Sequence, residues 1–200
     1  NLGGGSCYDQ EAFDEIAKVA ASLGCATHID GARVFNAAVA TGVDVARMCE
    51  HYDSVSICFS KGLGAPVGSV LVGSSAFIAR AHRWRKMFGG GWRQAGVLAA
   101  ACLHALDHHV DRLEEDHERA HQIALMLNAL PEFTVDLDTV QTNMVYAKTT
   151  RPAAEVVKHY GENGIDMFDL SENRIRVVVH LHITDEDVAK FTEVSQRLFG

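Results

Sequence analysis

The chain has 200 residues, 48% of them hydrophobic, and a formal net charge of −8. This hydrophobic content is enough for a buried core, and the acidic balance argues against a nucleic-acid-binding surface. No apolar run approaches the length of a membrane span, so the sequence predicts a globular protein that binds neither nucleic acid nor membrane.

The first predicted elements are an amphipathic helix and a short strand. The helix covers residues 8–23 and ends at Gly24. Residues 25–29 predict a strand that ends at Asp30, and helical spacing resumes directly afterwards. An aspartate at such a junction can cap the helix, or it can hold a ligand at the carboxyl end of the strand.

A second strand leads to a lysine. The β-branched run 54–59 predicts a buried strand, and Lys61 lies where it stops. The link through residues 62–68 is too short for a parallel crossover, so strand 69–73 is predicted to run antiparallel to strand 54–59. A partly desolvated lysine at a strand end can form a Schiff base, whereas a lone loop lysine is usually solvated.

Asp30 and Lys61 together are the pair that a pyridoxal phosphate site requires. The cofactor needs a lysine for its aldehyde and a carboxylate for its pyridinium nitrogen. The glycine-rich loop after Lys61 has neither the dinucleotide-binding pattern nor the Walker spacing, although a nucleotide-binding α/β module is the alternative use of this loop. Ser60 could donate to the cofactor phosphate or be an ordinary turn serine.

The middle of the chain is predicted to be helical. An Arg- and Lys-rich helix is expected over 75–87, and residues 94–129 predict one long helix or two with a bend. Three glycines precede Arg93, where backbone amides near a helix start could approach an anion, and Lys86 is a weaker candidate of the same kind. The alternatives are a flexible hinge and a solvated basic face.

Pro131 marks a predicted domain boundary, which divides the chain into residues 1–130 and 131–200. The second part alternates strands and helices. Its predicted elements are strands at 134–135, 143–147, 165–168 and 174–180, a helix from Pro152, and a last helix capped by Thr184 with Asp187 at the third position.

One arginine in this second part is a candidate for substrate binding. Arg176 alternates with apolar residues on the predicted strand 174–180. A charge on a buried strand needs a partner, and the planar guanidinium matches an amino-acid carboxylate with two hydrogen bonds. The alternative is an edge-strand arginine that faces water.

The histidines and cysteines indicate structural roles. Histidines between residues 104 and 121 include two pairs with i,i+4 spacing, which can bind a metal, but acidic residues surround them as on a solvated face, so no metal site is predicted. The five cysteines contain no CxxC pair. Cys25 and Cys58 fall inside predicted strands, so we expect reduced core cysteines and a cytoplasmic protein.

Six stretches of the chain resemble the low-specificity L-threonine aldolases, which are pyridoxal phosphate enzymes. These are HIDGARVFNAAVATG (28–42), DSVSICFSKGLGAPVGSVLVG (53–73), RWRKMFGGGWRQAG (83–96), DHERA (116–120), QTNMV (141–145) and RIRVVVHLHIT (174–184). They follow the family order over nearly the whole chain. The resemblance implies an α/β fold of the aspartate-aminotransferase type, fold type I of the pyridoxal phosphate-dependent transferases. Residues 1–130 would be part of the large domain and residues 131–200 the small C-terminal α/β domain.

The resemblance also implies an activity, which is cleavage of L-threonine, L-allo-threonine and related β-hydroxy-α-amino acids to glycine and an aldehyde. It assigns Lys61 and Asp30 to the cofactor and Arg176 to the substrate carboxylate. The family motif R-x-V-T-H selects Arg176 over Arg174, and Val179 occupies the threonine place. The alternatives are another pyridoxal phosphate-dependent beta-eliminating lyase and an inactive fragment of such an enzyme.

Further roles follow from the same resemblance. Arg33 would lie near the cofactor's phenolic oxygen and the substrate carboxylate, and Arg93 would lie near the cofactor or its phosphate. Many family members have methionine at the place of Trp92. The family's active sites form between subunits, so a homodimer or homotetramer is expected.

The opening of the chain, NLGGG, resembles an interior segment of the family. We therefore expect the chain to be the C-terminal portion of a longer enzyme. Expressed by itself, it is expected to be poorly soluble and to lack cofactor absorbance, because three strands cannot complete the sheet of the large domain.

Overall fold

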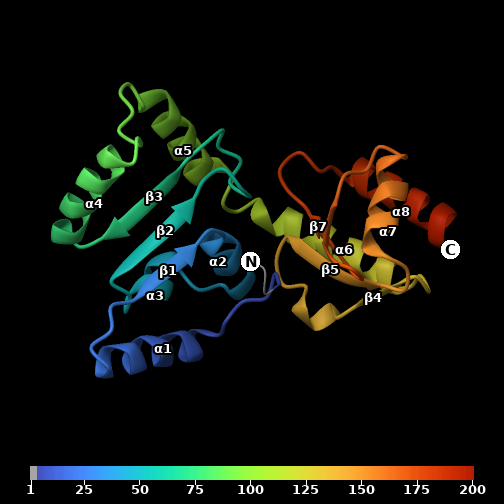
Figure 1. Ribbon diagram of the computed structural model, residues 1–200, viewed down its shortest axis with the longest axis horizontal. Helices are drawn as coiled ribbons and strands as arrows, with labels where there is room; N and C mark the ends of the chain where they lie inside the picture. The colour runs from blue at the N-terminus through green and yellow to red at the C-terminus, as the bar shows by residue number, and fades with distance from the viewer. Residues whose placement is uncertain (1–3) are drawn as a thin grey trace. The chain divides into compact units, whose positions relative to one another are not determined.

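The computed structural model describes residues 4–200, which form two compact units (Figure 1). One unit runs from Tyr8 to Asp111. The other contains Arg112–Gly200 together with the N-terminal segment up to Cys7. Each unit has its own sheet and its own helices.

The sheet of the Tyr8–Asp111 unit has three strands in the order β1-β2-β3. These are β1 (His28–Gly31), β2 (Ser54–Cys58) and β3 (Ser69–Gly73). Strand β2 pairs in parallel with β1 and antiparallel with β3. The antiparallel prediction for the strand after Lys61 is therefore confirmed.

Five helices accompany this sheet: α1 (Gln10–Ser22), α2 (Val34–Thr41), α3 (Val45–Cys49), α4 (Ser75–Met87) and α5 (Gly96–His108). Three of them begin at a side chain that accepts a hydrogen bond from a backbone N–H of the first turn. These N-caps are Asp9 for α1, Asp44 for α3 and Ser74 for α4. They satisfy amide groups that have no partner inside the helix.

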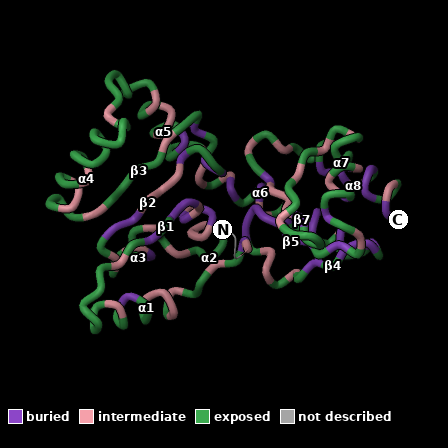
Figure 2. The backbone as a smooth tube through the Cα atoms, viewed as in Figure 1, coloured by how far each residue is buried: buried purple, intermediate pink, exposed green. Residues whose placement is uncertain are grey.

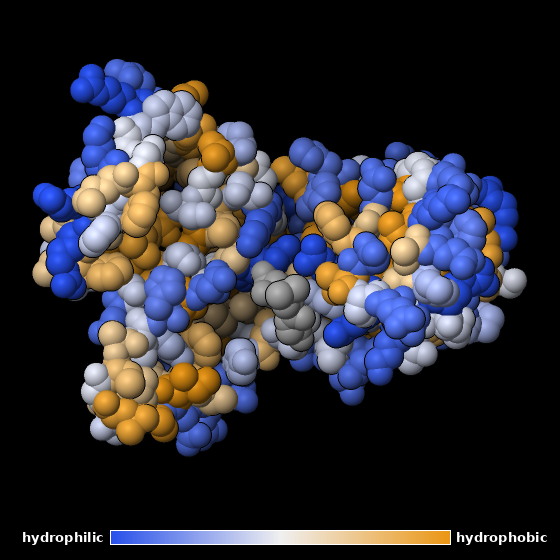
Figure 3. Space-filling model, in the orientation of Figure 1, coloured by the Kyte–Doolittle hydropathy of each residue, from blue (hydrophilic) through white to orange (hydrophobic). Residues whose placement is uncertain are grey.

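Much apolar surface of this unit is exposed (Figures 2 and 3). Val70, Leu71 and Val72 on β3 are each more than a third exposed, although successive strand residues point to opposite faces. Apolar side chains also gather over the solvent side of α1, as Figure 3 shows, and α4 buries none of its residues. Exposed apolar surface of this extent typically marks an interaction surface.

The second unit is built on a four-stranded sheet in the order β4-β5-β7-β6. Its strands are β4 (Phe133–Val135), β5 (Met144–Thr149), β6 (Phe168–Ser171) and β7 (Arg174–Val178), and all of its pairings are antiparallel. The helices are α6 (Leu113–Asn128), α7 (Ala153–Gly161) and α8 (Asp185–Phe199), with a short 3-10 helix η1 (Leu137–Thr139).

One face of this sheet forms the core. Alternate residues of β5 and β7, such as Val145 and Ile175, are fully buried against the helices. The ring of Tyr160 stacks on Phe191 at a centroid distance of 5.2 Å, and its hydroxyl lies 2.8 Å from Ser195 Oγ. Burial raises the pKa of Tyr160 to about 12, so this phenol stays neutral in the core.

Helix α8 begins as predicted. Thr184 is its N-cap and forms a reciprocal capping box with Asp187. The Asp187 carboxylate accepts hydrogen bonds from the backbone N–H and the hydroxyl of Thr184, and these bonds lower its pKa.

Several predicted boundaries differ from the structure. The expected strand 25–29 forms three residues later, over 28–31, because Thr27 is bound to the Asp53 carboxylate instead of to a strand. Cys25 is consequently exposed and outside the sheet, so its expected core role was wrong. The expected strand 165–168 likewise forms later, over 168–171.

The region 94–129 contains two helices, and the two compact units divide between Asp111 and Arg112 rather than at residue 130. Helix α6 packs its buried residues against β4 and β5, so it belongs to the second unit. The predicted division into residues 1–130 and 131–200 thus assigned α6 to the other part of the chain.

Glu132, directly before β4, binds the two residues that follow β5. Its carboxylate is buried and accepts hydrogen bonds from the N–H and hydroxyl of Thr150 and from the N–H and Nε of Arg151, at 2.8 to 3.1 Å. Burial raises the pKa of Glu132, but these hydrogen bonds and the Arg151 charge outweigh it, so the net pKa lies below the usual glutamate value.

We expect Glu132→Gln to lower the free energy of unfolding by about 1–3 kcal/mol at neutral pH, because an amide cannot accept from all four donors. A depressed carboxyl pKa contributes stability above the unfolded-state pKa, and this contribution is lost as pH falls through the folded-state pKa. Urea unfolding at several pH values should show the difference between the two proteins shrinking at acidic pH. Glu155→Gln is the matched control, because Glu155 is an exposed carboxylate 3.7 Å from Arg151. A difference that stays constant with pH would contradict this account.

Candidate active site

The candidate site lies at the carboxyl ends of β1 and β2. These strands are parallel neighbours, and Asp30 of β1 pairs with Ser56 of β2. Lys61 follows the end of β2 by three residues. Ligands of α/β sheets gather at this edge of parallel strands. The pairing therefore brings the sequence-predicted aspartate and lysine to the same edge of one sheet.

The side chain of Asp30 is exposed, and it is bound to the backbone of the turn that follows it. One carboxylate oxygen accepts a hydrogen bond from the N–H of Ala32 at 3.2 Å. His28 does not bond to Asp30, because its Nδ1 lies 2.9 Å from Ser54 Oγ on the neighbouring strand. The next residue must be glycine, since a Cβ at Gly31 would lie 2.8 Å from the carbonyl oxygen of Ser56.

The Lys61 loop is a tight turn held by backbone hydrogen bonds, and its lysine side chain is exposed. The N–H of Gly64 bonds to the carbonyl of Lys61 at 2.9 Å, and the N–H of Ala65 bonds to the carbonyl of Phe59 at 2.9 Å. Gly64 has a φ of 71°, which favours glycine. Phe59 and Leu63 are buried, whereas the side chains of Ser60 and Lys61 are exposed.

The two loops pack against each other on their inner side. Gly62 and Leu63 of the Lys61 loop meet the segment Gly31–Asn36, and the small space between them cannot hold a water molecule. A ligand of this site would therefore lie on the outer side, where Asp30 and Lys61 are exposed. Arg33 is half-buried at the N-terminus of α2 and makes a contact inside the protein.

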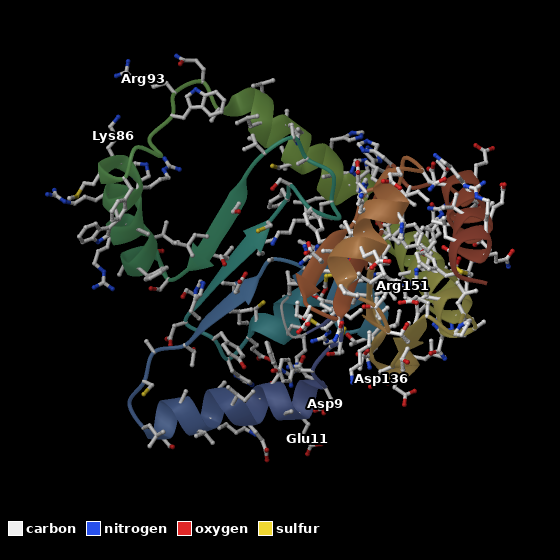
Figure 4. The ribbon with its side chains drawn as sticks, turned by 45° about the vertical axis from the view of Figure 1, so that its right-hand side comes forward. Asp9, Glu11, Lys86, Arg93, Asp136 and Arg151 are labelled. Carbon is white, nitrogen blue, oxygen red and sulfur yellow. The ribbon has the colours of Figure 1, made fainter. Side chains whose placement is uncertain are left out.

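Arg93 and Lys86 lie on a different part of the same unit. Lys86 is in the last turn of α4, and Arg93 is in the loop that leads to α5 (Figure 4). An open hollow of about 700 Å³ lies against this region. Lys86 and Arg85 line it together with His82, Arg83, Met87, Gly91 and Trp92. This basic lining favours an anion. Helix α5 begins at Gly96, two residues later than predicted, so Arg93 precedes the helix by three residues.

Arg176 belongs to the second unit, where β7 is an interior strand between β5 and β6. The alternative of an edge-strand arginine is therefore excluded. Its guanidinium lies 5.1 Å from the ring centroid of Phe168, and its Nε is buried without a hydrogen-bond acceptor among residues 4–200. Arg174 is exposed, with its guanidinium 5.1 Å from the ring centroid of Tyr146. A buried donor that lacks an acceptor fits a carboxylate ligand at Arg176.

The part of the chain that the structure describes holds no cluster of three His, Cys, Asp or Glu side chains suited to a metal ion. It also contains no helix that is both long and apolar enough to cross a membrane.

A comparison with known protein families decides the classification. A family model described as beta-eliminating lyase matches residues 1–150. The chain belongs to the beta-eliminating lyase family. Members of this family use pyridoxal 5'-phosphate, and the Lys61 amine and the Asp30 carboxylate, at one edge of one sheet, fit that cofactor.

Individual relatives agree with this classification. Low-specificity L-threonine aldolase 1 of Arabidopsis thaliana is 44% identical over 92% of this chain and 53% of its own length. The structure superposes on a threonine aldolase of Leishmania major with a TM-score of 0.76 and 17% identity, over 96% of this chain and 57% of that one. It also superposes on a phosphoserine aminotransferase of Cytophaga hutchinsonii with a TM-score of 0.63 and 16% identity, over 94% of this chain and 59% of that one.

The predicted fold class is thereby confirmed as fold type I of the pyridoxal phosphate-dependent transferases. The chain spans about half the length of the relatives that it matches.

One residue of the site was not recognised in the sequence. His109 lies at the end of α5, and its Nδ1 is 2.7 Å from the carbonyl oxygen of Leu63 in the Lys61 loop. The sequence shows it as one of several histidines on a helix rich in acidic residues. Nothing in the helical periodicity indicates that this ring reaches a loop 46 positions away.

Proposed function

We propose that the complete protein is a pyridoxal phosphate-dependent aldehyde-lyase. It would cleave L-threonine, L-allo-threonine and related β-hydroxy-α-amino acids between Cα and Cβ, giving glycine and an aldehyde. The observation that carries the proposal is the placement of Asp30 and Lys61 at the ends of two paired parallel strands. The named relatives favour threonine as the substrate.

Each residue would have a defined task. When bound, pyridoxal phosphate supplies an electron sink for the negative charge that develops at the substrate Cα. The Lys61 amine would hold the cofactor's aldehyde, and the Asp30 carboxylate would keep the ring nitrogen protonated. Arg176 would bind the substrate carboxylate with two hydrogen bonds and so fix the direction of the Cα–Cβ bond.

The remaining residues would bind the cofactor's polar groups. Ser60 is exposed beside Lys61 and can donate its hydroxyl to the phosphate. Arg33 begins α2 directly after the Asp30 turn, which suits contact with the phenolic oxygen and the substrate carboxylate. Arg93, with Lys86, contributes positive charge from the α4–α5 region for the phosphate, in the same or a neighbouring subunit.

The assembly and location are part of the proposal. Apolar residues on β3 and on α1 are exposed on the Tyr8–Asp111 unit, and a homodimer or homotetramer would cover such surface. The five cysteines are free thiols, which suits the reducing cytoplasm.

Product analysis of the full-length protein tests the proposed reaction. With L-threonine, retro-aldol cleavage gives glycine and acetaldehyde, whereas β-elimination gives 2-oxobutanoate and ammonia. Equal amounts of glycine and acetaldehyde would support the proposal, and 2-oxobutanoate would indicate another lyase of the family. Loss of the cofactor's visible absorbance after borohydride reduction, with mass added at Lys61, would identify the lysine.

Asp30→Asn separates the two roles of this residue. Asparagine can still accept the hydrogen bond from Ala32 N–H, but a neutral amide cannot hold a proton on the ring nitrogen. We expect cofactor binding to persist and kcat to fall by about 10²-fold or more, the loss typical of a removed electrostatic partner. Asp44→Asn is the control, because Asp44 accepts only an N-cap hydrogen bond, from Ala46 N at 2.7 Å. An unchanged kcat in Asp30→Asn would leave Asp30 as a turn residue only.

A further inference from the structure

His109 connects the C-terminus of α5 to the loop that carries Lys61. It is the C-cap residue of the helix, and its backbone N–H bonds to the carbonyl of Ala105 at 2.9 Å. Its half-buried ring places Nδ1 at 2.7 Å from the carbonyl oxygen of Leu63. A carbonyl can only accept, so Nδ1 carries the proton and donates it.

The Leu63 carbonyl is the point at which another element binds the loop. Leu63 is 3% exposed and lies two residues after Lys61. The other hydrogen bonds of the turn join residues of the loop to one another, namely Gly64 N to Lys61 O and Ala65 N to Phe59 O. These bonds set the shape of the turn. The bond from His109 comes from a different element and fixes the turn to α5.

We propose that His109 is a positioning residue for Lys61, and this inference rests on the proposed function. The Lys61 side chain is exposed and makes no hydrogen bond among residues 4–200, so in this structure the backbone of the turn is what fixes the point from which it extends. Small displacements of a reacting group are costly in enzymes, where about 1 Å can cost about 10²-fold in rate. His109 would reduce such displacement by holding the turn at the Leu63 carbonyl.

Neighbouring histidines do not share this arrangement. The ring of His104 lies edge-on to His109 at a centroid distance of 5.2 Å, and His108 lies 4.4 Å from His104. His108 is exposed, and its ring makes no hydrogen bond among residues 4–200. His108→Leu is therefore a matched control that changes the same helix end without touching the loop.

Three substitutions of His109 test whether the side chain needs a hydrogen-bond donor and where that donor must lie. His109→Asn keeps an N–H donor at the same number of bonds from Cβ as Nδ1. His109→Gln moves the donor one bond further, and His109→Leu removes it. Asparagine should restore the loop, glutamine should restore it only in part, and leucine should not. His109→Gln keeps a polar side chain at this position. It therefore still tests the inference if His109→Leu does not fold.

Hydrogen exchange in the full-length protein without cofactor is the first measurement. The amides of Gly64 and Ala65 report on the turn. In His109→Leu they should exchange about three- to tenfold faster than in wild type, the effect expected for one net hydrogen bond. His109→Asn and His108→Leu should match wild type. Unchanged exchange in both His109→Leu and His109→Gln would overturn the inference.

Steady-state kinetics of the holoenzyme is the second measurement. We expect His109→Leu to lower kcat about tenfold with little change in KM, and His109→Asn to recover most of it. Faster loop exchange with a wild-type kcat would also overturn the positioning role. If the wild-type protein has no cofactor-dependent turnover, the proposed function fails. The exchange measurement then decides by itself whether His109 holds the Lys61 loop.

Discussion

Lys61→Ala is expected to abolish the absorbance of the lysine-bound cofactor and to lower turnover of L-threonine by on the order of 10³-fold or more. The reason is specific to this side chain, because no other lysine lies on the Lys61 loop. The fold should survive the substitution. The Lys61 side chain makes no hydrogen bond or ion pair among residues 4–200, and the Gly64 N–H bond uses only its backbone carbonyl.

Two measurements on the full-length protein check this expectation. A visible absorbance spectrum with added pyridoxal phosphate shows whether the cofactor is held covalently, and an acetaldehyde assay measures turnover. Lys18→Ala is the control, since Lys18 is an exposed lysine on α1 of the same unit. A Lys61→Ala protein with the wild-type spectrum and rate would remove the basis of the proposed function.

The sequence predicted which strands and helices surround the site better than it predicted their first and last residues. Strand β3 and helix α4 have the predicted bounds, because β3 ends at Gly73 and Ser74 is the N-cap of α4. Strand β1 was placed too early. Its start depends on pairing with β2 and on the Asp53 carboxylate that holds Thr27, and neither contact is visible in local periodicity.

The break between α5 and α6 shows a second limit of local patterns. Residues 109–112 contain no proline or glycine, so the sequence could not decide between one long helix and two helices with a bend. The structure has two helices, and the two compact units divide between them, at Asp111 and Arg112. The predicted domain boundary at Pro131 lies close to the end of α6. It does not reflect that α6 packs against the strands of the second unit.

The reactive residues of the site were more predictable than the contact that holds the Lys61 loop. Asp30 and Lys61 follow recognisable strands, so their residue types and positions could be interpreted directly. The bond between His109 and Leu63 joins residues 46 positions apart and depends on where α5 lies. The roles of Ser60, Arg33 and Arg93 stay predictions, and Arg93 lies in a loop that no periodicity could place.

Arg176→Lys is expected to raise KM for the amino-acid substrate by about 10- to 100-fold, because a single ammonium replaces the two parallel hydrogen bonds of a guanidinium. The strand pairing gives the reason for choosing this arginine. Arg176 lies opposite Tyr146 on an interior strand, with a buried Nε that has no acceptor among residues 4–200. A substrate carboxylate would satisfy that donor, so the cost of losing it appears in binding.

Arg174→Lys is the matched control, two residues away on the same strand and the same face. Arg174 is exposed, and its contact with the Tyr146 ring can be kept by a lysine. We therefore expect its KM to stay within about twofold of wild type, which is the range of surface substitutions. Thermal unfolding of both variants shows whether the strand itself is disturbed. If Arg174→Lys raised KM and Arg176→Lys did not, the substrate carboxylate would have to be assigned to the exposed arginine, and the buried Nε would need another acceptor.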